Sequence, residues 1–131
     1  MVETSLRIVL NLDMKYSLLL ISVFYFHLPG LTQKLNTGTY IFKYCDLEYH
    51  SCISTCKVII KGDSITIYAT KELAKNRTFT KEGDIVDQGI ILKHNSGKWI
   101  VGKSRKDINA KDIGVEGPSI LDFKKKQYWR F

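Results

Sequence analysis

The feature that most constrains the fold is a series of short runs in which apolar and polar residues alternate between turn-forming residues. The clearest is KVIIKGDSITIYAT at 57–70, in which two alternating runs flank a Gly62-Asp63 turn. A period of two places successive side chains on opposite faces of a strand, and a tight turn between two such runs is typical of a β-hairpin. This segment is therefore predicted to form an antiparallel pair of strands.

Other segments repeat this pattern, and none of 10–12 residues carries a helical stripe. One further strand and two further hairpins are predicted, at TYIFKY (39–44), GIILKHNSGKWIVGK (89–103) and SILDFKKKQYWRF (119–131). TKELAKN (70–76) is predicted to form one or two helical turns, and 104–119 a long polar connection. Short strands joined by hairpins must close or fold over to remove their edges. We expect an all-β fold, a small antiparallel meander of about seven strands closing into a barrel or half-barrel.

The stretch MKYSLLLISVFYFHLPGLTQK, at 14–34, has the parts of a secretory signal. A lysine supplies the positive start, 18–26 is an uncharged apolar run, and a Pro-Gly pair then breaks the helix. Gly30 and Thr32 provide the small residues expected before a cut at Gln33. The apolar stretch is shorter than the roughly 20 residues that span a bilayer, so a membrane anchor is disfavoured.

These signals divide the chain into three parts. Residues 1–13 are interpreted as an extension that precedes the true start of translation, because acidic residues stand where a signal should be basic. Residues 14–32 are the predicted signal peptide, and 33–131 form one β-barrel-like domain. We expect a secreted or periplasmic protein with no stable membrane insertion after cleavage.

The charge balance bears on the partner. The chain has 20 Lys and Arg against 13 Asp and Glu, a net charge of +7. Such a surplus favours anionic partners or maintains solubility. Because nucleic acid is scarce outside the cytoplasm, it is not expected as a partner.

All three cysteines lie within YCDLEYHSCISTC at 44–56. Cys45, Cys52 and Cys56 are disulfide candidates, because an oxidising compartment favours a bridge between two of them. The sequence does not choose the pair, and the third thiol is either buried or available to a second molecule. With His50 they form Cys-x4-His-x-Cys-x3-Cys, which is not a common zinc spacing. No metal site and no cofactor are expected.

No residue is predicted to be catalytic, and the protein is not expected to be an enzyme. His94 adjoins a hairpin turn and is predicted to be exposed to solvent. No nucleophile, metalloprotease or phosphate-loop motif is present. The carboxylates fall mostly in expected turns and connections, where they cap and solvate the backbone: Asp63, Asp84, Asp87, Asp107, Asp112 and Glu116.

One resemblance rests on a few residues and the strand pattern. Gly38-Thr39-Tyr40 opens the first strand, and Arg130 lies on the last. An exported meander of this kind resembles the lipocalin-like small barrels exported by bacteria. That family opens on Gly-x-Trp and often places an arginine over the Trp ring, so Tyr40 would replace the Trp and Arg130 would be that arginine. The resemblance implies a small apolar ligand in the barrel mouth and no catalysis.

Two groups of residues are candidates for recognition. The first is a set of aromatic and basic side chains that either line a pocket or belong to the core: Tyr40, Phe42, Tyr44, Trp99, Tyr128 and Arg130. The second is a Gly- and Pro-containing loop that either recognises a partner or is simply a turn: Gly114, Glu116, Gly117 and Pro118.

Two versions of a non-catalytic exported binding protein remain open. In the first, the barrel holds a small apolar or amphipathic ligand. In the second, a solid barrel presents loops to another protein, as inhibitors of exported enzymes or toxin-neutralising proteins do. About seven strands leave little interior space, which favours the second version, whereas the lipocalin-like resemblance favours the first. The two versions are therefore ranked nearly equal. A ligand binder should have an unfilled cavity, whereas an interaction module should have a packed interior and an exposed apolar patch.

Overall fold

The strands form where the alternating runs predict them. The computed structural model describes residues 34–131; the predicted N-terminal extension, signal peptide and cleavage point before Gln33 lie outside the described residues. The bounds of the seven strands are β1 (Gly38–Asp46), β2 (Ser51–Lys61), β3 (Ser64–Ala69), β4 (Ile85–Lys93), β5 (Trp99–Gly102), β6 (Ser119–Asp122) and β7 (Gln127–Arg130). The predicted hairpin turn at Gly62-Asp63 joins β2 to β3, and Gly62 has the positive φ, 60°, that this turn requires.

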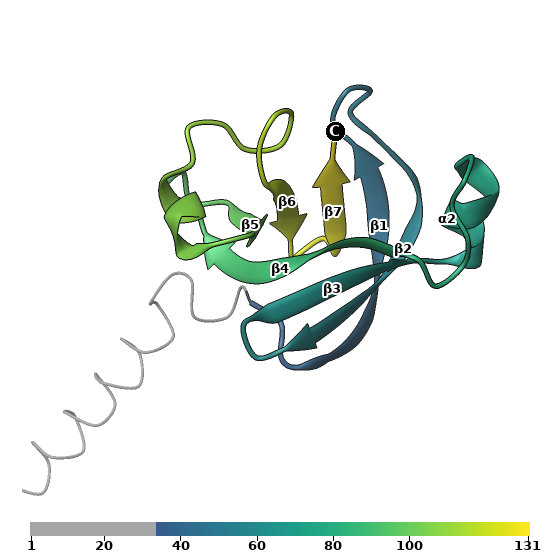
Figure 1. Cartoon of the computed structure of the whole chain (residues 1–131), viewed down its shortest axis with the longest axis horizontal. Coiled ribbons are helices and arrows are strands. Elements are labelled where there is room, and N and C mark those ends of the chain that lie inside the picture. The colour runs from purple at the N-terminus through teal and green to yellow at the C-terminus, as the bar shows by residue number, and fades with distance from the viewer. Residues whose placement is uncertain (1–33) are drawn as a thin grey trace, which may run out of the picture. The chain divides into compact units, whose positions relative to one another are not determined.

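The sheet is a closed barrel in which the strands follow one another in chain order (Figure 1). Each consecutive pair is antiparallel, whereas β1 and β7, which complete the circle, are parallel. The parallel seam follows from the odd number of strands, because the first and seventh strands of an up-and-down meander run in the same direction. The predicted all-β barrel of about seven strands is therefore confirmed.

Side chains fill the interior of this barrel. Alternation along β1 buries Phe42 and Tyr44, and Phe42 packs edge-on against Phe123 with ring centroids 6.3 Å apart. Branched aliphatic residues of β2 and β3, the next two strands of the barrel, add to this core. The buried cluster is Phe42, Tyr44, Cys56, Val58, Ile60, Ile65, Ile67, Ala69, Leu73, Ile91, Val101, Leu121, Phe123 and Tyr128. Residues 35–131 form one compact unit around it.

Two short helices complete the domain. α2 (Lys71–Asn76) is the predicted pair of helical turns, and its Leu73 side chain is buried in the core. Thr70 caps it, because its hydroxyl accepts a hydrogen bond from the Leu73 amide at 3.2 Å. The 3₁₀ helix η1 (Arg105–Asn109) lies in the predicted polar connection. No helix within 34–131 is long and apolar enough to cross a membrane.

A candidate recognition surface at one end of the barrel

The inward face of the sheet becomes polar at the end where β7 finishes. Lys103 follows the buried Val101 by two positions, and Arg130 follows the buried Tyr128 by two. The period of two that builds the core therefore also brings these charged side chains to the mouth of the barrel. Asp87, from β4, lies with them around one cleft.

Asp87 is the centre of a hydrogen-bonded cluster. The Tyr128 hydroxyl donates to Asp87 Oδ2 at 2.8 Å. The same hydroxyl oxygen is within hydrogen-bond distance, 3.1 Å, of the Ser119 hydroxyl oxygen. Lys103 Nζ lies 2.6 Å from Asp87 Oδ1 and also donates to the carbonyl of Gln88. Burial by itself would raise the pKa of Asp87, but the hydrogen bonds from Lys103 and Tyr128 and the lysine charge outweigh it. The pKa of Asp87 is lowered as a result, and the carboxylate is ionised at neutral pH.

Tyr128 cannot serve as an acid in this cluster. Burial raises its pKa well above the usual value, and the negative charge of Asp87 raises it further. The hydroxyl therefore stays protonated and acts as a fixed donor to Asp87. The cluster is a structural network that holds β4, β6 and β7 together at the mouth.

Arg130 is the cation with the fewest partners at this mouth. Its Nη1 atom donates to the Val86 carbonyl at 2.7 Å, and no carboxylate within residues 34–131 forms a salt bridge with it. Its side chain borders an open cleft of about 400 Å³. Among the described residues, the guanidinium group donates this one hydrogen bond, so further N–H donors remain for a group that enters the cleft.

The predicted interaction loop forms the other wall of the cleft. The four predicted residues, Gly114, Glu116, Gly117 and Pro118, all line it. The Gly114 amide donates to the Pro118 carbonyl at 2.7 Å, with Gly114 at φ 87°. A Cβ atom on Gly117 would lie 1.9 Å from the Asp112 carbonyl oxygen. Both glycines are thus required by the backbone, and a hydrogen bond between Gly114 and Pro118 closes the loop.

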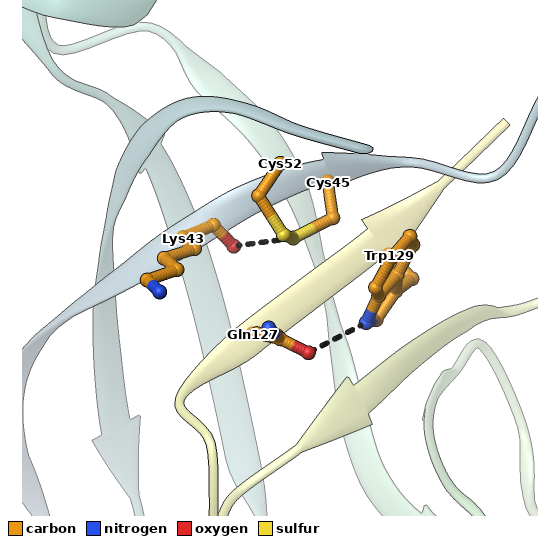
Figure 2. Close-up of a disulfide and its surroundings, with 5 residues drawn as sticks. All are labelled: Lys43, Cys45, Cys52, Gln127 and Trp129. Atoms are coloured by element: carbon orange, nitrogen blue, oxygen red, sulfur yellow. Dashed lines mark hydrogen bonds between the residues drawn. A yellow bond between two sulfur atoms is a disulfide. The ribbon is translucent and has the colours of Figure 1, made fainter. Parts of the chain in front are cut away.

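A disulfide holds the neighbouring turn between β1 and β2. Cys45 and Cys52 are opposite each other in the register and are bonded, beside β7 (Figure 2). The Leu47 amide donates to the Arg130 carbonyl at 3.0 Å, which ties the turn to the end of β7. Tyr49, at the tip of this turn, is 72% exposed. The bridge therefore braces a turn that displays an exposed aromatic ring and is bonded to the end of β7.

The third cysteine is part of the core. Cys56 is fully buried, and burial raises the pKa of its thiol to about 12. The sequence left open whether the third thiol is buried or available to a second molecule, and the structure shows that it is buried. A thiol with this pKa is protonated at neutral pH and is a poor nucleophile.

Three structural segments therefore meet at one end of the barrel, which we call the recognition end: turn 47–50, loop 112–118 and residues 130–131. Figure 1 shows the β1–β2 turn, the loop before β6 and the C-terminus at the same end of the sheet. Val115 and Phe131 are 53% and 59% exposed at the edge of the cleft. Two exposed apolar side chains thus border the cleft that contains the charged cluster.

The structure distributes the six predicted ligand-binding residues between the core and the mouth. Phe42, Tyr44 and Tyr128 are buried in the filled interior. Trp99 is half-buried and packs edge-on against Phe123. Of the six, only Arg130 lines the cleft.

Tyr40 lies far along β1 from Arg130. In the register of β1 and β7, Arg130 is opposite Asp46, whereas Tyr40 pairs with Val58 of β2. The cation near the Tyr40 ring is Lys126, whose Nζ is 6.0 Å from the centroid. The arginine-over-ring contact expected from the lipocalin-like resemblance is therefore not formed.

Two side chains are placed differently from their sequence-based expectation. His94 is buried rather than exposed, because residues 108–110 of the connection pack over its turn; its Nε2 donates to the Ala110 carbonyl at 2.8 Å. Asp87 lies in β4 and not in a turn. The sequence did contain a signal for this placement: Asp87 is four residues before Ile91, so in a strand the two side chains lie on the same face.

Metal and cofactor sites were not expected. Within residues 34–131, no group of three or more His, Cys, Asp or Glu side chains could hold a metal ion. The chain matches no protein-family model, no curated protein and no solved structure.

Proposed function

We propose that this protein is a non-catalytic binding protein, a solid β-barrel that binds another protein through the recognition end. The observation that carries the proposal is the cleft beside Arg130, bordered by the exposed apolar side chains of Val115 and Phe131, at the same end of the barrel as the disulfide-braced β1–β2 turn. This is the second of the two versions that the sequence left open. An exported enzyme or toxin is the kind of partner that the predicted export favours.

The filled barrel interior supports this version. A ligand that entered the barrel would have to displace residues such as Phe42 and Tyr128, which are 0% exposed. Protein interiors are close-packed, so such displacement is costly. Binding is therefore expected outside the core, at the surface.

The stiffness of the recognition end also supports it. Ordering of flexible loops subtracts from binding free energy, and a preformed loop avoids that cost. The Cys45–Cys52 bridge and the Gly114-to-Pro118 hydrogen bond preform both loops. Tyrosine and arginine are among the residue types that most often dominate protein interfaces, and this end of the barrel presents Tyr49 and Arg130.

The test is affinity capture from the source organism's medium and lysate, with substitutions at exposed positions. Tyr49→Ser and Val115→Ser are expected to weaken retention of a captured protein about tenfold or more, since each removes buried interface area. Ile41→Ser is the matched control, because Ile41 is also exposed but lies on the outer face of β1. Equal retention by all three variants, or loss only with Ile41→Ser, would contradict the proposal.

A small amphipathic ligand in the same cleft is the second candidate function. The observations in its favour are the cleft volume of about 400 Å³ and the absence of a carboxylate partner for Arg130 among the described residues. Native mass spectrometry of the purified chain would then show an extra mass that leaves on activation. That mass should be lost in Arg130→Gln and kept in Lys61→Gln, a basic control outside the cleft. No extra mass in the wild type would exclude this candidate and leave the protein-binding proposal intact.

A further inference from the structure

A second exposed feature lies away from the recognition end, in the loop that follows α2. Phe79 is 99% exposed and has φ 65°, in the left-handed region. Large side chains other than Asn, Asp and His rarely adopt this conformation. A phenylalanine that is both strained and in contact with almost nothing is unfavourable for the isolated fold, and such outliers suggest a function.

Hydrogen bonds hold the base of this loop. The Gly83 amide donates to the Ala69 carbonyl at 2.9 Å, and the Ala69 amide donates to the Asp84 carbonyl at 2.8 Å. Asp84 Oδ2 accepts from the Lys81 amide at 2.9 Å. These bonds fix the base of the loop and leave Phe79 at its projecting tip. Figure 1 shows α2, which leads into the loop, at the edge of the barrel opposite η1.

Basic residues lie close to this tip in the sequence. Arg77 and Lys81 flank Phe79 two positions away on either side, and both are exposed. Arg77 is held in place because its Nη1 donates to the Tyr44 hydroxyl at 3.0 Å. Lys71 and Lys75 of α2 are also exposed.

The nearby acids oppose these cations only in part. Three acids lie within 71–84: the Glu72 carboxylate accepts from the Thr55 hydroxyl at 3.2 Å, Asp84 is bound to the loop backbone as described above, and Glu82 is exposed. The segment therefore carries four cations against three acids. The net charge of the chain, +7, adds a long-range attraction toward anionic surfaces. An exposed aromatic ring with exposed lysines near it in the chain, on a basic protein, can insert at the interface of an anionic membrane.

We propose that the Phe79 loop is a peripheral membrane contact, with Phe79 entering the headgroup region of an anionic lipid surface and the adjacent cations pairing with lipid phosphates or carboxylates. Within 71–84, Phe79 is the one large apolar side chain that is exposed, and the next one along the chain, Ile85, is 55% exposed at the start of β4. A single ring at the tip of the loop favours lipid over a protein-binding patch. This inference stands on different residues from the protein-binding proposal and does not depend on it.

The test places a fluorescent reporter at the tip. Full-length Phe79→Trp is mixed with vesicles of phosphatidylcholine and phosphatidylserine that carry a quenching doxyl lipid, and its emission is compared with that of the wild type. The expected result is quenching and a blue shift beyond those of the wild type, whose Trp99 and Trp129 provide the background. Phe131→Trp is the matched control at the recognition end and should show neither change. Emission from position 79 that does not respond to vesicles would overturn the proposal.

Co-sedimentation with the same vesicles gives an independent readout. Phe79→Asn removes the ring and keeps a residue that tolerates the left-handed conformation, so the fold should be unharmed. Its partition coefficient is expected to fall about tenfold, and that of Lys81→Gln about fivefold. Binding by Phe79→Asn equal to the wild type would contradict a role for the ring, whatever the overall charge of the chain contributes.

Discussion

Removal of the Cys45–Cys52 bridge should destabilise the domain by a predictable amount. The two cysteines are 7 residues apart and close a loop of eight residues. Chain entropy then assigns the bridge about 2.5 kcal/mol of stability, because it restricts the unfolded chain. Domains of this size have only about 5–15 kcal/mol in total. A loss of about 2.5 kcal/mol lowers the melting temperature of a domain of about 100 residues by about 10–20 °C.

The variant should be Cys45→Ala with Cys52→Ala, because Cys45 is fully buried and a serine would add an unsatisfied hydroxyl. Guanidinium unfolding of the oxidised wild type and the double variant, followed by circular dichroism, measures the difference. Cys56→Ala is the control for the loss of a buried sulfur. A double variant within about 0.5 kcal/mol of the wild type would refute the chain-entropy argument.

Three further perturbations test the interior and the cleft. Because the pKa of the Cys56 thiol is raised to about 12, Ellman's reagent at pH 8 should label the native chain negligibly and denatured chain fully; rapid native labelling would show that the thiol is accessible. Asp87→Asn should cost about 1–2 kcal/mol at pH 7 in urea unfolding, since its hydrogen bonds lose a charged acceptor. The pKa of Asp87 is lowered in the folded state, so this stabilisation is present above about pH 4 and is lost as the pH falls through the folded-state value; a difference that did not shrink as the pH was lowered below about 4 would contradict the assignment. Gly117→Ala should cost about 1–3 kcal/mol by calorimetry, because the new methyl group meets the Asp112 carbonyl oxygen; an unchanged melting temperature would show that the loop adjusts freely.

The parts of the fold that depend on local sequence could be predicted. The alternation around Gly62-Asp63 specifies a hairpin by itself, because strand period and turn conformation are properties of adjacent residues. The barrel then follows from the need to cover strand edges. To predict that β1 and β7 pair in parallel, one needs to know in addition only that the number of strands is odd.

The cleft could be predicted only in part, because its geometry depends on register between distant strands. The Gly- and Pro-containing loop and Arg130 were both identified from residue type, but their meeting at one cleft requires the closure of β7 onto β1. The Cys45–Cys52 pairing depends on a register shift between Tyr44 and Cys45 that no local sequence pattern indicates. The contact between Asp87 and Tyr128 spans 41 residues, so Asp87 looked like an ordinary surface carboxylate.

The central claim is that a protein partner binds at the recognition end of a filled barrel. The most direct measurement is hydrogen–deuterium exchange of the chain alone and in complex with the protein captured from the source organism. The proposal predicts new protection at turn 47–50, loop 112–118 and residues 130–131, with the β2–β3 hairpin around 61–64 unchanged. Protection confined to that hairpin, or to the outer face of the sheet, would contradict it.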